Sequence, residues 1–138
     1  MASASDFQSW AEPDLVIPLG GQTFRVRPPS VDDAAKVLAC AVRGEVNLRM
    51  VEGPIPDEVQ AVLDTIGPDD HPALGDAYQE MKKAGLSAIT INRLGYYAVF
   101  YWARGEEYAD TLARLLFTPR VTDDLFPDED SEPAPKGS

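Results

Sequence analysis

Apolar and polar residues alternate in two short runs near the start of the chain, a period that predicts β-strands with one apolar face. Gly20-Gly21 separates the runs and tolerates the positive φ angles of a two-residue hairpin. Pro18 lies within the first run, which indicates an edge strand. We predict a β-hairpin over 14–28 that packs on helices, because an isolated hairpin is marginal in water. The apolar positions are Leu15, Ile17, Leu19, Phe24 and Val26.

From residue 30 to about residue 117, apolar residues recur three and four positions apart, the period of amphipathic helices. Ser30, with an acid three residues later, resembles a capping box, and Gly44 is a suitable helix end. Residues 45–55 fit either a short strand or a helical turn. The predicted helices begin and end at about 30–43, 56–66, 72–84, 87–104 and 106–117.

The spacing of apolar residues also predicts which side of each helix faces the core. The first helix is expected to turn Ala34, Val37, Leu38 and Ala41 inward. The last is expected to present Tyr108, Leu112, Leu115 and Leu116. The fold class is therefore mainly α, a compact domain of about five helices with a small N-terminal hairpin.

The helix predicted over 87–104 is the most apolar segment and carries a run of aromatic residues. Such a helix is either central to a core or buried against a partner. Tyrosine and tryptophan are enriched at interface hot spots, whereas aromatic stripes more often fill a core, so both interpretations stay open. The candidate partner-binding residues are Tyr97, Phe100, Tyr101 and Trp102, with Tyr78 from the preceding helix.

The two ends of the chain differ from this helical domain, which we place at 14–121. Residues 1–13 form a short polar arm. From residue 122 acids and prolines crowd together, which predicts a disordered acidic tail over 122–138. Leu125 and Phe126 are its only large apolar residues. They are candidates for a docking motif; the alternative is a solvated tail without a role.

Charge and composition restrict the partners. Acids outnumber bases 23 to 12 in the 138 residues, a net charge of -11, so the chain repels nucleic acid and anionic lipid. Basic or apolar surfaces are the expected partners, although the charge also serves solubility alone. The chain has no apolar run long enough to span a membrane and no signal-peptide pattern. With Cys40 as its only cysteine, it is expected in a reducing cytoplasm.

The residues offer no reaction centre. His71 is the only histidine and lies beside Asp69 and Asp70, where a solvated turn is favoured over a metal site. Cys40 falls on an apolar helix face, which argues against a nucleophile paired with His71. Gly20-Gly21 precedes a strand and not a helix, so it is no phosphate loop. We expect no enzyme, no cofactor and no metal.

The order of these features points to a family. The hairpin reads Leu15-Val-Ile-Pro-Leu-Gly-Gly-Gln-Thr-Phe-Arg-Val26, and a helical body with the spacing Leu74-Gly75…Tyr78…Met81…Gly85 follows it, before the acidic, proline-rich end. Over about residues 13–117 this layout resembles the small tail assembly chaperones of long-tailed phages that infect actinobacteria. The resemblance implies a protein that binds the long, helical tape measure protein during tail tube assembly and is absent from the finished virion.

The resemblance also implies further partners. Such chaperones often have a longer product, made by ribosomal frameshifting, whose extension recruits the major tail protein. Ala134-Pro135-Lys136 can be encoded by GCC-CCA-AAG, which contains a slippery sequence. A second copy of the chain is a further partner to consider. The competing hypotheses are a structural neck or tail-completion subunit of the virion, and an acidic regulator that covers a basic surface.

Overall fold

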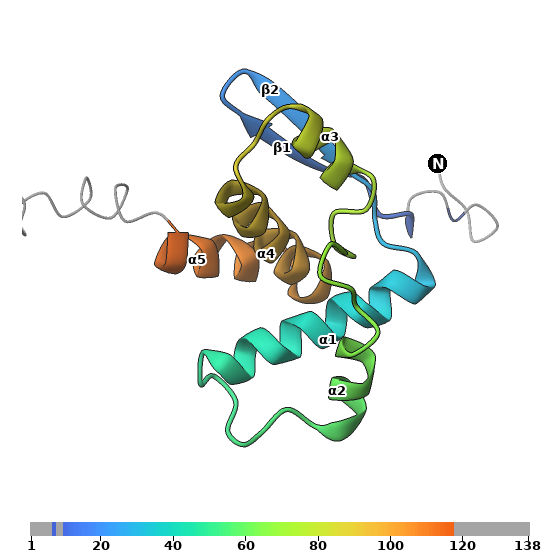
Figure 1. The fold of residues 1–138 in the computed structure, drawn as a ribbon, viewed down its shortest axis with the longest axis vertical. Helices are drawn as coiled ribbons and strands as arrows, with labels where there is room; N and C mark the ends of the chain where they lie inside the picture. Colours follow the sequence, from blue (N-terminus) through green and yellow to red (C-terminus); the bar gives the residue numbers. More distant parts are fainter. Residues whose placement is uncertain (1–6, 8–9, 118–138) are drawn as a thin grey trace, which may run out of the picture.

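The computed structural model describes Phe7 and residues 10–117 (Figure 1). This part of the chain confirms the predicted fold class, five helices with an N-terminal antiparallel hairpin. The predicted tail, with Leu125 and Phe126, lies outside the described residues, as does most of the predicted arm. The elements are β1 Leu15–Leu19, β2 Gln22–Val26, α1 Val31–Asn47, α2 Asp57–Leu63, α3 Ala77–Lys83, α4 Ala88–Arg104 and α5 Glu106–Phe117.

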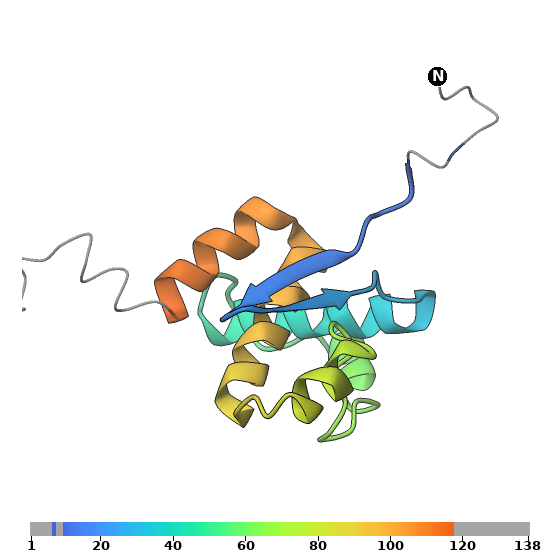
Figure 2. The ribbon, with the colours of Figure 1, turned by 90° about the horizontal axis from the view of Figure 1, so that it is seen from above.

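Helix α4 lies at the centre of the fold and contributes to two hydrophobic clusters (Figures 1 and 2). In the first, it packs with the inner face of the hairpin, with Val37 of α1 and with Leu74 and Met81 around α3. In the second, Phe100 of α4 packs with Ala41 of α1 and with α5. Since α1 and α5 both contact α4, the surface between these helices is held on a rigid framework.

The hairpin follows its sequence pattern. Gly20 and Gly21 form the turn, with φ of 54° and 89°, as a type I′ turn requires. Its register pairs Leu19 with Gln22 and Leu15 with Val26, which directs one face to the helices. The buried side chains of this face are Leu15, Ile17, Phe24 and Val26.

The helix starts at the two serines are also confirmed. The Ser30 Oγ atom accepts a hydrogen bond from the Asp33 N–H at 3.2 Å, and Ser87 Oγ accepts one from Thr90 at 3.1 Å. Gly85, with φ of 83°, ends α3 as predicted. The Leu86 N–H there returns to the Met81 carbonyl at 3.2 Å, the pattern of a Schellman motif.

Several predicted element boundaries differ from the structure. Helix α1 continues through Gly44 to Asn47, because Gly44 is buried against α4 and keeps helical backbone there. Most of 45–55 forms turns, so neither predicted alternative describes it beyond the last turn of α1. Helix α3 begins at Ala77 and not at residue 72, since Gly75 has a φ of 55°, which interrupts a right-handed helix.

Two predicted helix faces are wrong in part. Leu38 is 49% exposed, because the inner face of α1 is rotated towards Val37, Ala41 and Glu45. Leu115 is 77% exposed, because α5 turns Ala109 and Leu112 towards α4. The shorter α2, which ends at Leu63 and not at residue 66, leaves Ile66 on the loop that follows.

Candidate functional site

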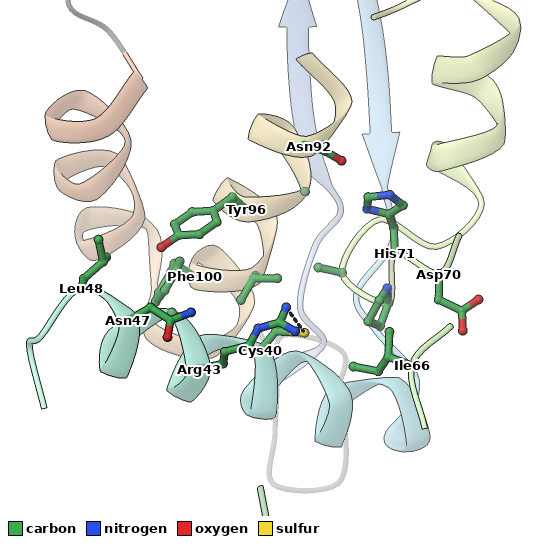
Figure 3. A pocket seen from close by; sticks show the side chains of 15 residues that line it. Cys40, Arg43, Asn47, Leu48, Ile66, Asp70, His71, Asn92, Tyr96 and Phe100 are labelled. Atoms are coloured by element: carbon green, nitrogen blue, oxygen red, sulfur yellow. Dashed lines mark hydrogen bonds between the residues drawn. The ribbon is translucent and has the colours of Figure 1, made fainter. Parts of the chain in front are cut away.

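An apolar groove of about 360 Å³ lies between α1 and α4 and is closed at one end by the loop after α2 (Figure 3). We call it the α1–α4 groove. Figure 3 shows Asn47, Arg43 and Cys40 along α1, opposite Tyr96 and Phe100 of α4. Its lining residues are Cys40, Arg43, Gly44, Asn47, Leu48, Ile66, Asp70, His71, Pro72, Ala73, Asn92, Gly95, Tyr96, Val99 and Phe100.

Two helix glycines let the walls of the groove come close together. A Cβ atom on Gly44 would lie 3.0 Å from Phe100 Cζ, and one on Gly95 would lie 3.2 Å from His71 Nδ1. Neither position has room for a larger side chain without movement of its neighbour. The width of the groove therefore depends on these two glycines.

Several polar side chains that line the groove have defined contacts. Arg43 Nη2 lies 3.9 Å from the Cys40 Sγ atom. The Asp70 carboxylate accepts a hydrogen bond from the Gly67 N–H at 2.9 Å. The His71 ring packs on Tyr78, with ring centroids 4.3 Å apart. His71 lies in a connector made largely of turns, as expected, but its side chain is half-buried and not fully solvated.

Burial also shifts the pKa values of two titratable side chains that line the groove. It raises the pKa of the Cys40 thiol, partly offset by the charge of Arg43. It lowers the pKa of His71, against the opposing effect of Asp69 and Asp70. Both shifts favour the uncharged form of the side chain, which suits an apolar groove.

A second apolar hollow, the α5 groove, lies between α5 and the segment that follows α1. It has a volume of about 410 Å³ and is lined by Met50, Tyr108, Thr111, Leu112 and Leu115, with Glu107 at its edge. Leu48 lines the first groove, and Met50, two residues later, lines the second. The two grooves are therefore close to each other. Large apolar side chains exposed in this region are Leu48, Met50, Val51, Leu115 and Leu116.

A buried ion pair holds the helices beneath these grooves. Glu45 is 6% exposed, and its two carboxylate oxygens accept hydrogen bonds from Arg104 Nε and Nη2, both at 2.8 Å. The Tyr108 hydroxyl donates to Glu45 Oε2, also at 2.8 Å. These bonds join α1, α4 and α5, and the hydrogen bond from Arg104 lowers the pKa of Glu45 most.

The aromatic candidates do not form one surface. Phe100 is 1% exposed and forms part of the floor of the α1–α4 groove. Tyr97 donates to Asp110 at 2.5 Å and, with Tyr101, faces β1. Trp102 donates from Nε1 to the Ala73 carbonyl at 3.1 Å, and Tyr78 packs on His71.

The sequence predictions missed most of the groove, including Arg43 and Leu48. One signal was available: Gly44 and Gly95 each lie within a helical pattern, where glycine is unfavourable and usually has a packing reason. The described residues contain no group of three or more His, Cys, Asp or Glu side chains placed to hold a metal. No helix in the same part of the chain is long and apolar enough to cross a membrane.

Comparison with known proteins adds one finding. No curated protein and no solved structure matches the chain significantly. A family model described as "Domain of unknown function (DUF7426)" matches residues 5–136, which include every element of the fold and both grooves. The chain therefore belongs to the DUF7426 family.

Proposed function

We propose that this protein is a phage tail assembly chaperone that binds a helical segment of the tape measure protein and keeps it soluble during tail tube assembly. The observation that carries the proposal is the pair of apolar grooves near the C-terminal end of α1. The resemblance of the hairpin and of the Leu74–Gly85 segment to such chaperones supplies the identity of the client.

The two grooves suit an amphipathic helix. A helix in a groove inserts apolar side chains at positions i, i+3 or i+4 and i+7, about one turn apart. The α1–α4 groove and the α5 groove offer two hollows near the end of α1, the first lined by Leu48 and the second by Met50. A client helix that crosses the end of α1 buries its anchors in both, with the exposed apolar residues as the rim.

The charge of the chain has a separate role. A net charge of -11 keeps a complex with an aggregation-prone client dissolved. The binding itself rests on apolar contact and needs no catalytic group. In this proposal the protein acts in the cytoplasm of the infected cell and leaves the tail before the virion is complete. A longer frameshifted form would bring the major tail protein to the same client.

Co-expression with the tape measure protein tests the proposal. We expect the client to stay in the soluble fraction and to co-purify with the chaperone. Leu48→Asp places a charge in the lining of the α1–α4 groove and should weaken the complex at least about tenfold, which corresponds to 1.4 kcal/mol. Leu38→Asp is the matched control, since Leu38 is a similarly exposed leucine of α1 outside both grooves. Equal loss in both variants, or a client that is soluble alone, contradicts the proposal.

Two further measurements separate the competing functions. Mass spectrometry of purified virions should not find the protein, whereas a neck or tail-completion subunit would be present. The complex should also persist at high salt, because apolar contacts are not screened. An acidic regulator on a basic surface would instead dissociate, since charges are screened beyond about 10 Å at 0.1 M salt.

A further inference from the structure

In the described part of the chain β1 pairs with β2 alone, so its outer edge carries no third strand. In the register of β1 and β2, Leu15, Ile17 and Leu19 lie opposite Val26, Phe24 and Gln22 around a two-residue turn. These pairs exchange hydrogen bonds, so the backbone groups of Val16 and Pro18 point away from β2. Val16 offers an N–H and a carbonyl there, and Pro18 offers a carbonyl only.

This edge faces a groove that the proposed client site does not use. Figure 2 shows β1 on the α5 side of the hairpin. Between them lies a hollow of about 440 Å³, the β1 cleft, whose floor is Leu94, Tyr97 and Tyr101 of α4. The outward backbone of β1 forms one wall, from residue 14 to residue 18. An apolar floor beside a free strand edge has the form of a strand-addition site.

The rim of the β1 cleft is acidic. Asp14 and Glu106 line it, and no basic side chain does so within the described part of the chain. The pKa of Tyr101 is raised by burial first, and then by the charges of Glu106, Glu12 and Asp110. Three carboxylates therefore act on Tyr101 in the floor, and Asp14 lines a cleft to which no described basic side chain contributes.

We propose that the β1 cleft binds an extended, basic segment of a partner protein, which adds to the free edge of β1 as a third strand. Apolar side chains of the segment contact Tyr97 and Tyr101, and its lysine or arginine side chains meet Asp14 and Glu106. The Val16 N–H and carbonyl supply main-chain hydrogen bonds. This site is distinct from the two grooves of the proposed client.

The acidic rim of the β1 cleft favours a basic segment over two other occupants, a second copy of the chain and the chain's own C-terminal segment. Pairing of β1 with β1 of a second copy would bring together two sets of Asp14 and Glu106, in chains of charge -11 each. Segment 123–132 of the same chain carries acids and no base, so it does not complement the rim. A basic segment satisfies both the hydrogen-bonding edge and the carboxylates.

Blocked octapeptides of alternating lysine and valine provide the probe, with alternating glutamate and valine as the charge-reversed control. Fluorescence anisotropy of labelled peptides measures the affinity, and NMR of the full chain reports the Val16 amide. We expect the lysine peptide to bind at least about tenfold more tightly than the glutamate peptide, a difference of 1.4 kcal/mol. Its binding should slow hydrogen exchange at Val16.

Two pairs of variants make the test specific. Val16→Pro removes the outward N–H without loss of a β1–β2 hydrogen bond, and Pro18 already occupies an equivalent outward position. It should weaken binding, whereas Val16→Thr should not. Asp14→Asn with Glu106→Gln should reduce the preference for lysine, whereas Asp57→Asn with Glu58→Gln, in α2, should leave it unchanged. NMR spectra of each variant verify the fold.

The inference is overturned by equal affinity for both peptides, by equal affinity of Val16→Pro and Val16→Thr, or by a shift from monomer to dimer that β1 variants abolish. An increase in affinity after removal of 118–138 would assign the cleft to the chain's own end and also overturn it. None of these measurements involves the tape measure protein or Leu48. The two proposals therefore fail or hold independently.

Discussion

The ring of Phe100 occupies the space that a side chain on Gly44 would need. The Phe100 Cζ atom lies 3.0 Å from the position of a Cβ atom on Gly44, and the Tyr96 hydroxyl lies 3.2 Å from it. Phe100 is buried, and Tyr96 packs on it with ring centroids 5.1 Å apart. The crossing of α1 over α4 and the floor of the α1–α4 groove therefore depend on the same pair of residues.

Gly44→Ala should destabilise the protein although alanine favours helices. The helix gains at most about 1 kcal/mol from the substitution. Overpacking of a core typically costs about 1–3 kcal/mol, and the Phe100 ring has little room to move. We expect a net loss of about 1 kcal/mol in the free energy of unfolding, measured by urea denaturation. The double variant with Phe100→Leu should lose less than the sum of the single variants; additive losses would contradict the contact.

This pair also explains what the sequence predicted and what it missed. The period of apolar residues located the hairpin and all five helices, because those patterns are local. The same local reasoning made Gly44 a helix end, since a glycine after a helical run usually ends it. Only the approach of Phe100, more than fifty positions later, shows why glycine is required inside α1. The orientation of a helix likewise depends on contacts with residues distant in the sequence. For this reason the sequence analysis assigned Leu38 and Leu115 to the core.

The candidate site was harder to predict than the fold. The aromatic run in α4 was identified, but a helix directs successive residues to different sides, so Phe100, Tyr101 and Trp102 reach different surfaces. The groove itself is built from α1, α4 and the loop after α2, and these segments are distant from one another in the sequence. Tyr96, which the run contains, lines the groove, but no spacing rule distinguishes it from Tyr97.

Removal of one partner of the Glu45–Arg104 pair should destabilise the protein. Loss of a fully buried partner costs about 3–5 kcal/mol, and a third of the Arg104 side chain is exposed to screening solvent. For Arg104→Met we therefore expect a loss of about 1–2 kcal/mol, from chemical denaturation at neutral pH. Arg93→Met in the same helix is the control, since it leaves the Glu45 carboxylate paired. A loss no larger than in this control would contradict the role of the pair.

The Glu45–Arg104 pair should also make the stability of the fold depend on acidic pH. The pKa of Glu45 is lowered from its ordinary value of 4.5, so the folded state holds the ionised form. Its contribution is complete above pH 4.5 and is lost as the pH falls through the folded-state pKa. Glu45→Gln should therefore lose stability at pH 7 and show a smaller further loss on acidification than the wild type, in denaturation curves between pH 7 and 3. Parallel curves for the two proteins would contradict the assignment.

Cys40 is an internal reporter for the α1–α4 groove. It is the only cysteine, it lines the groove, and burial raises the pKa of its thiol. We expect alkylation by iodoacetamide to be slower than that of a free thiol at pH 7.5, because less thiolate is present. A bound client should slow the reaction further, and a bulky maleimide on Cys40 should weaken client binding.

A cysteine moved to position 38 controls this labelling. In the Leu38→Cys, Cys40→Ser variant the thiol lies on the exposed side of α1, outside the groove. Its alkylation should be fast with or without the client, and the maleimide should leave client binding intact. If the client protects both thiols equally, the complex does not use the α1–α4 groove.

His71 should make the stability of the fold depend on pH near neutrality. Its folded-state pKa is lowered from 6.5 by burial, which outweighs the opposing charges of Asp69 and Asp70. Below pH 6.5 the unfolded state therefore binds more protons than the folded state, and the free energy of unfolding falls with the pH. One such group changes it by at most about 1.4 kcal/mol per pH unit. The full contribution is present above pH 6.5.

Thermal denaturation between pH 7.5 and 5.5 measures this effect, in a range above the usual pKa values of carboxylates, near 4. We expect the melting temperature of the wild type to fall across that range. The curve of His71→Gln should be flatter, because glutamine fills similar space without a proton to gain. Since His71 packs on Gly95 and lines the α1–α4 groove, client affinity should weaken over the same range. An equal slope for both proteins would show that protonation of His71 is not opposed by the fold.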